Sequence, residues 1–140
     1  NHACVLRRLL DLGPVVQVGL RSAAREEHDL IRQQGLPFFS VAAYRTLADG
    51  PREVLSHLGE NVYVTVDLDA FDPSQMAAVG TPEPGGLVWE EVVGLLAAVA
   101  GQRRVVGFDV TELAPGLGTF ANAQLAAKLV YRLIGLAVRE

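Results

Sequence analysis

Two aspartates, Asp67 and Asp69, follow a run of β-forming residues and are separated by a single leucine. Because side chains alternate along a strand, we expect both carboxylates to point to the same side, with Cα atoms roughly 6.5 Å apart. Two such carboxylates repel each other unless a cation lies between them or one takes up a proton. A pair of hard divalent ions would satisfy both. The same pattern also fits one aspartate that caps a turn and another that is solvated.

A second pair of acids, Asp109 and Glu112, lies within and just beyond the apolar run 105–110. A carboxylate there could hold a guanidinium group through two parallel hydrogen bonds, although a surface acid at a strand exit is commoner. Between the two acidic segments, residues 80–86 are rich in Gly and Pro, which fix unusual backbone angles. This loop is either a stiff wall beside a strand end or only a turn. Asp72 is expected to cap it, since Asp-Pro opens turns.

The elements that must position these acids alternate between strand-like and helical patterns. Ser22 is expected to cap the second helix, because its hydroxyl can accept from first-turn N–H groups. Apolar strands separated by helices indicate a parallel sheet covered on both faces, with ligands at the carboxyl ends of the strands. We expect strands over 15–20, 36–41, 61–68 and 105–110, helices over 5–12, 22–35, 51–58, 89–100 and 121–138, and irregular chain over 72–87.

Length and composition limit the remaining possibilities. The chain has 140 residues, enough for one domain, of which 50% are hydrophobic and 20% charged, a globular composition. A net charge of −4 without a basic run argues against nucleic acid as the partner. The one cysteine, Cys4, gives no disulfide framework and favours a reducing, cytoplasmic location. No apolar run reaches the roughly 18 residues of a membrane span. The chain opens at Asn1 without a methionine, which we interpret as a fragment or processed chain.

Taken together and in this order, the motifs resemble the ureohydrolase family, which includes arginase, agmatinase and formimidoylglutamase. The resemblance covers essentially the whole chain, as the C-terminal portion of a single domain over residues 1–140. It implies an arginase-like α/β fold, a three-layer α/β/α arrangement with a mainly parallel sheet, incomplete in this chain. The segments that carry it are DLDAFDP at 67–73, GTPEPGGL at 80–87 and GFDVTELAP at 107–115, with VQVGLR at 16–21 and NAQLAAKLVY at 122–131 closest to the agmatinase type.

The resemblance also implies an activity and the residues that perform it. The activity is hydrolysis that releases urea from a small guanidinium compound, agmatine to putrescine in polyamine biosynthesis, with a pair of Mn²⁺ ions and a homo-oligomeric complete enzyme. The match makes Asp67 and Asp69 metal ligands and Glu112 the catalytic carboxylate that orients the guanidinium. Thr81 is expected to bind substrate, and His2 to shuttle a proton.

The sequence departs from the family pattern in one large respect. The family's other metal ligands lie in upstream Gly-Gly-Asn/Asp-His and Asp-Ala-His-x-Asp motifs, and neither occurs here. Two aspartates alone do not give two metal ions their usual number of ligands, so the 140 residues are expected to be inactive alone. A family strand between this chain's first and third strands is missing too, so the chain is expected either to have a gap in its sheet or to close up in a way that the family does not.

Other functions stay open at this point. Guanidinobutyrase, arginase and formimidoylglutamase are alternative members of the family. A non-catalytic binding or oligomerisation module that derives from the same fold is an alternative of another class. A generic phosphate binder is disfavoured, because no Gly-rich loop leads from a strand into a helix.

Overall fold

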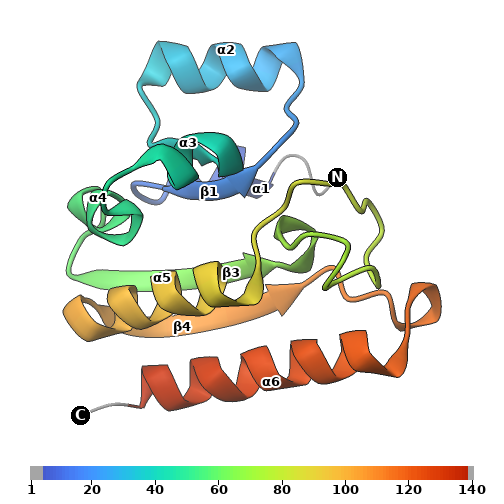
Figure 1. Ribbon diagram of the computed structural model, residues 1–140. Helices are drawn as coiled ribbons and strands as arrows, with labels where there is room; N and C mark the ends of the chain where they lie inside the picture. The colour runs from blue at the N-terminus through green and yellow to red at the C-terminus, as the bar shows by residue number, and fades with distance from the viewer. Residues whose placement is uncertain (1–4, 139–140) are drawn as a thin grey trace.

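Four strands form two separate parallel pairs in the structure, a computed structural model that describes residues 5–138 (Figure 1). Strand β1 (Gln17–Leu20) pairs with β2 (Phe38–Ser40), and β3 (Asn61–Asp67) pairs with β4 (Arg104–Thr111). Within the described part of the chain, no strand joins the two pairs. The predicted parallel α/β fold is therefore confirmed, and its sheet is interrupted between β1–β2 and β3–β4.

Helices follow the strands and pack mostly on one side of them (Figure 1). Helices α3 to α6 contact one another in sequence, so they form a continuous layer beside the strands. No helix of the described residues combines the length and the apolarity that crossing a membrane requires. The helices are α1 (Val5–Leu9), α2 (Arg25–Gln34), α3 (Val41–Thr46), α4 (Gly50–Ser56), α5 (Trp89–Gln102) and α6 (Phe120–Ala137).

The core lies between this helical layer and one face of β3–β4. Alternate residues of β3 face it: Val62 and Val66 are buried, whereas Tyr63 is 61% exposed. Apolar side chains of α3 to α6 complete the cluster, and burying each is worth about 1.5–3 kcal/mol. On the opposite face, Val106 of β4 is 58% exposed. The described residues thus cover only one face of this pair of strands.

The irregular segment between β3 and α5 closes on itself beside the end of β3. The Asp72 N–H donates to the carbonyl of Leu87 at 2.9 Å, and the Leu87 N–H donates to the carbonyl of Ala70 at 2.9 Å. A Cβ at Gly86 would lie 2.4 Å from the Asp72 nitrogen, so only glycine fits where the two ends of the segment meet. The expected irregular loop is confirmed, and its ends are fixed to each other.

Asp72 caps this loop, as predicted. Its carboxylate accepts hydrogen bonds from the N–H groups of Ser74 at 3.0 Å, Gly85 at 2.8 Å and Gly86 at 3.1 Å. Hydrogen bonds from Ser74 and from these glycine N–H groups stabilise the charged form, so the pKa of Asp72 is lowered to about 2. The negative charge of one side chain thus holds both ends of the loop.

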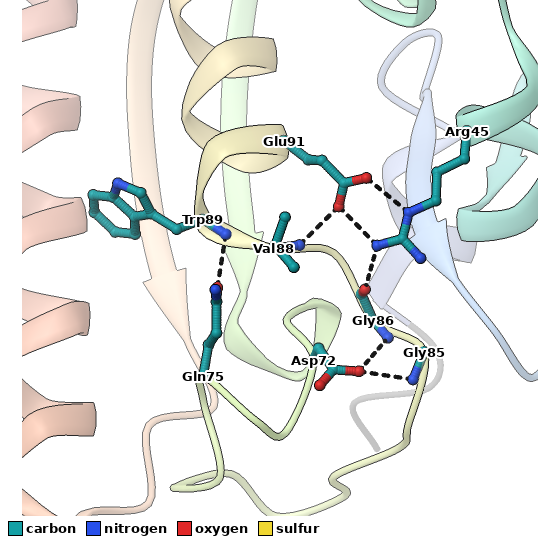
Figure 2. Close-up of polar contacts among 8 residues, drawn as sticks. All are labelled: Arg45, Asp72, Gln75, Gly85, Gly86, Val88, Trp89 and Glu91. Atoms are coloured by element: carbon teal, nitrogen blue, oxygen red, sulfur yellow. Dashed lines mark hydrogen bonds and ion pairs between the residues drawn. The ribbon is translucent and has the colours of Figure 1, made fainter.

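An ion pair ties the same loop to the helical layer (Figure 2). The Arg45 guanidinium of α3 contacts both carboxylate oxygens of Glu91 in α5, at 2.7 and 2.9 Å, and donates to the carbonyl of Gly86 at 2.9 Å. Glu91 also accepts from the N–H of Val88 at 2.8 Å, one of the unpaired donors at the start of α5. The loop, α3 and α5 therefore share one polar network.

One sequence prediction about local structure is wrong, and one helix was missed. Helix α2 begins at Arg25, not at Ser22, because the Glu27 carboxylate accepts from the N–H of Ala24 at 2.8 Å. The Ser22 hydroxyl instead donates to the carboxylate of Glu83 at 2.6 Å. Helix α3 was not predicted at all. It is a single short helix capped by the Ser40 side chain, too brief to leave an amphipathic pattern.

Candidate metal and substrate site

The two aspartates lie at the carboxyl end of β3, but not as strand alternation predicts. The strand ends at Asp67, and Asp69 lies in the following 3₁₀ turn, Leu68–Ala70. The cause is local: Asp67 Oδ1 accepts a hydrogen bond from the Asp69 N–H at 2.8 Å, which turns the chain away from the strand direction. The alternation argument is therefore wrong, although both aspartates lie at the predicted end of the strand.

The charges around Asp67 are unfavourable for a carboxylate. Desolvation by partial burial raises the pKa of Asp67, although part of the residue is exposed. The hydrogen bond from the Asp69 N–H acts in the opposite direction, while the negative charges of Asp69 and Glu112 raise this pKa further and Arg21 lowers it. A cation between these acids would remove the conflict.

Asp69 is held on one side and unsatisfied on the other. Its Oδ2 accepts a hydrogen bond from the hydroxyl of Thr81 in the 80–86 loop. Its Oδ1 is buried and has no hydrogen-bond partner among the described residues. A buried carboxylate oxygen without a hydrogen-bond donor lowers the stability of the fold by an amount on the order of 1–3 kcal/mol. A bound cation would remove this cost, so the atom is a candidate metal ligand.

The oxygen atoms of the two aspartates are of the type that binds a manganese ion. Carboxylate oxygens suit hard divalent cations, and the unsatisfied Asp69 oxygen is available to one. They do not complete a site: residues 5–138 contain no group of three or more His, Cys, Asp or Glu side chains that could hold a metal. Asp67 and Asp69 can therefore supply part of a metal site, and the remaining ligands must come from elsewhere.

Glu112 lies directly after the neighbouring strand and beside the same loop. Thr111, the last residue of β4, pairs with Asp67, which brings the two strand ends together. The Glu112 backbone has φ +67°, a left-handed conformation that is uncommon outside glycine. Its Oε2 lies 4.0 Å from where a Cβ on Gly80 would be. Four side chains thus lie together at the carboxyl ends of β3 and β4, those of Asp67, Asp69, Thr81 and Glu112.

Asp109, the other acid of that motif, lies apart from this group. It points from the exposed face of β4 and accepts hydrogen bonds from Tyr63 Oη at 2.9 Å and Thr65 Oγ1 at 2.7 Å. Both of its carboxylate oxygens are therefore in use. Of the two acids, only Glu112 is placed to receive a guanidinium beside the aspartates.

Arg21 is a residue of this site that the sequence reasoning missed. It follows β1, and its guanidinium donates to the carbonyls of Gly19 at 3.1 Å, Ala70 at 3.2 Å, Asp69 at 2.7 Å and Glu83 at 2.9 Å. Two sequence signals were present: its place at the end of a strand, where site residues gather in parallel sheets, and the VQVGLR segment at 16–21 that carries part of the family resemblance.

Two further features lie outside this cluster. His2, the expected proton shuttle, falls outside the described residues. An apolar cavity of about 160 Å³ lies between α1, β1 and α2, and none of the clustered acids lines it. This cavity is therefore separate from the group of acids.

Sequence comparison identifies relatives along nearly the whole chain. A profile of the Arginase family matches residues 1–135. An N(1)-aminopropylagmatine ureohydrolase from Synechocystis sp. is 41% identical over 140 residues, which are 96% of this chain and 45% of that protein. A protein of the same name from Thermus thermophilus is 46% identical over 139 residues, 97% of this chain and 46% of that protein. An agmatinase from Pyrococcus horikoshii is 37% identical and matches 99% of this chain and 49% of that protein.

Solved structures share the fold. Proclavaminate amidino hydrolase from Streptomyces clavuligerus superposes with a TM-score of 0.88 at 30% identity and covers 98% of this chain and 49% of that one. The agmatine ureohydrolase of Thermoplasma volcanium gives a TM-score of 0.83 at 34% identity, with 98% and 47% covered. The chain spans about half the length of the curated relatives it matches. Sequence and fold agree that the chain belongs to the arginase family.

Proposed function

We propose that the chain is the C-terminal half of a ureohydrolase that releases urea from agmatine or a close derivative with a pair of manganese ions. The observation that carries this proposal is the clustering of Asp67, Asp69 and Glu112 at adjacent strand ends, with one buried Asp69 oxygen unsatisfied. The relatives named above supply the reaction class. The reaction adds water across one C–N bond of the guanidinium and yields urea and an amine.

In this proposal Asp67 and Asp69 hold metal with ligands from the rest of the enzyme. When bound, the ions would lower the pKa of a water molecule toward neutrality and so supply a strong nucleophile. The chain's own part is orientation. Thr81 holds one oxygen of Asp69 by a hydrogen bond, and this leaves the other oxygen for the metal. The Asp69 N–H holds one oxygen of Asp67 in the same way.

Glu112 binds the substrate guanidinium in this proposal. Its carboxylate accepts no hydrogen bond from the other described residues and lies beside the aspartates. A guanidinium presents paired N–H donors in a plane, which match the two oxygens of a carboxylate. A cation held there also offsets the crowding of negative charge around Asp67. His2 would pass a proton to the leaving amine, a role that rests on the resemblance alone.

The substrate tail distinguishes the candidates. Two of the relatives are named for N(1)-aminopropylagmatine and one for agmatine, so we propose that the substrate is one of these two compounds. Both present the same guanidinium to Glu112. They differ in the length and charge of the tail, so the preferred compound depends on the residues that contact the tail.

The test is urea release by the complete enzyme, loaded with Mn²⁺ and offered agmatine, N(1)-aminopropylagmatine, guanidinobutyrate and arginine in parallel. We expect turnover of about 1 per second or more on the preferred compound. A folded, Mn²⁺-loaded protein that releases urea from none of them would contradict the proposal and favour a non-catalytic module. The 140 residues alone should release none, and light scattering of the complete enzyme tests the expected homo-oligomer.

A further inference from the structure

We propose that Arg21 is a positioning residue that fixes Asp69 and the 80–86 loop against the end of β1, and so presets the metal-binding carboxylate. The inference rests on the proposed function to the extent that Asp69 binds metal. It concerns a residue that donates hydrogen bonds only to main-chain carbonyls, and to none of the carboxylates of Asp67, Asp69 and Glu112.

The contacts of Arg21 join three segments that are distant in sequence. One terminal nitrogen donates to the carbonyls of Gly19 in β1 and Ala70 after β3, and the other donates to those of Asp69 and Glu83. The partners beyond β1 lie 48 to 62 positions away along the chain. A single side chain thus connects the end of β1, the turn that carries Asp69 and the loop that carries Thr81.

These acceptors explain why an arginine occupies the position. The planar guanidinium offers five N–H donors on three nitrogens, and here two nitrogens each reach two carbonyls. A lysine has one nitrogen and cannot span the same acceptors. The Arg21 Nε is buried and has no hydrogen-bond partner among the described residues, which costs folding free energy. An apolar side chain would fill the same space without that cost, so packing alone does not explain the arginine.

The surrounding backbone is shaped to let Arg21 reach the site. Gly19 has φ +95°, and a Cβ there would lie 2.9 Å from the Leu87 side chain, so β1 approaches the loop closely at this point. The neighbouring Ser22 hydroxyl fixes Glu83 at 2.6 Å. The end of β1 therefore meets the loop through backbone, serine and arginine contacts together.

The consequence concerns the contact between Thr81 and Asp69. Arg21 restrains the main chain on both sides of that hydrogen bond, at Asp69 itself and at Glu83 two residues beyond Thr81. Without these restraints the ends of the loop stay joined at Ala70, Asp72 and Leu87, but the segment from Thr81 to Glu83 is no longer fixed directly to the turn that carries Asp69. The carboxylate of Asp69 would then no longer be held in one direction before a metal binds.

The experiment compares Arg21→Lys and Arg21→Gln with the parent in the complete enzyme. Mn²⁺ affinity is measured from the electron paramagnetic resonance signal of unbound Mn²⁺, and hydrogen exchange is followed in peptides that cover residues 68–72 and 80–87. We expect Mn²⁺ binding roughly 10- to 100-fold weaker, as for other residues that orient metal ligands. Exchange should rise in both segments, and excess Mn²⁺ should restore much of the urea release.

Arg103→Lys is the matched control. Like Arg21, Arg103 donates only to main-chain carbonyls. There are three of them, those of Leu58 at 3.2 Å, Leu55 at 2.8 Å and Gln102 at 3.0 Å. It precedes β4 and lies at the opposite end of that strand from the acids. Its variant should lower the melting temperature while it leaves Mn²⁺ affinity and exchange in residues 68–72 and 80–87 unchanged.

Each outcome decides for or against the role of Arg21. Parent-like Mn²⁺ affinity and exchange in both Arg21 variants would overturn it, as would equal weakening by Arg103→Lys, which would indicate a general loss of stability. If the parent neither binds Mn²⁺ nor releases urea, the proposed function fails. The exchange comparison then decides alone whether Arg21 fixes the turn and the loop.

Discussion

The carboxylate of Asp67 accepts a hydrogen bond from the main-chain N–H of Asp69 at 2.8 Å, so one aspartate sets the backbone that carries the other. Asp67 therefore has two tasks in the proposed site: it offers an oxygen to metal, and it holds the turn in which Asp69 lies. An asparagine keeps a carbonyl oxygen that can accept this hydrogen bond, whereas an alanine loses it. The two tasks can be separated by substitution.

Replacement of either aspartate should abolish activity through loss of metal. We expect Asp67→Ala and Asp69→Ala to retain little Mn²⁺, because each ion then lacks a ligand and the remaining acid lacks a counterion. Asp67→Asn should also bind metal poorly while it retains the turn. Metal content, determined beside the kinetics, is the measurement. Full Mn²⁺ occupancy in Asp69→Ala would show that its role is assigned wrongly.

Glu112→Gln should keep the metal and impair the substrate step. Loss of the negative charge removes a charge-assisted pair with the guanidinium, worth about 2–4 kcal/mol, or roughly 30- to 1000-fold in kcat/KM. Asp109→Asn is the control, since Asp109 is bonded to Tyr63 and Thr65 on the other face of the strands. It should leave kcat/KM unchanged, and a Glu112→Gln protein without Mn²⁺ would contradict the assignment.

The strands and the acids at their ends could be predicted because they depend on short stretches of sequence. Five consecutive β-forming residues precede Asp67, and the structure places a strand there. The 3₁₀ turn could not be predicted, because the Asp67 side chain competes with the strand for the Asp69 N–H. Either conformation is compatible with the same residue types.

The position of Arg21 could not be predicted for a different reason. Its acceptors are main-chain carbonyls, which every residue carries, and all but that of Gly19 lie 48 to 62 positions away. No residue type at those positions identifies them as partners. A gap in the sheet, in contrast, was one of the two outcomes expected from the family resemblance, and the two separate strand pairs agree with it.

Thr81→Val should weaken metal binding by loss of the hydroxyl that donates to Asp69. A hydrogen bond to a charged group is worth about 1.5–3 kcal/mol, which corresponds to roughly 10- to 100-fold in Mn²⁺ affinity. Thr81→Ser keeps the hydroxyl and should restore the affinity. If Thr81 bound only the substrate tail, both variants would instead keep the parent Mn²⁺ affinity, and only KM would change.

Asp72→Asn should change how stability depends on pH. The pKa of Asp72 is about 2 in the fold, below its ordinary value of 3.8, so the folded state favours the charged form. This stabilisation is complete above pH 3.8 and disappears as the pH falls through about 2. The difference in unfolding free energy between parent and Asp72→Asn, measured by urea titration, should therefore shrink over that range. A difference that stays constant would mean that the charge of Asp72 plays no part.

Gly86→Ala should destabilise the protein more than a typical glycine substitution. The new Cβ would lie 2.4 Å from the Asp72 nitrogen and 2.4 Å from the Phe71 carbonyl carbon, both backbone atoms that cannot move aside. Such overpacking costs about 1–3 kcal/mol, and here it also separates the ends of the loop that carries Thr81. Gly94→Ala is the matched control: Gly94 lies in α5 with nothing within 4 Å of the added carbon, so alanine should stabilise that helix by about 0.5–1 kcal/mol. Urea denaturation of both variants in the complete enzyme provides the measurement. If the two substitutions shifted the midpoint equally, the close contact between Gly86 and the end of β3 would have no energetic weight.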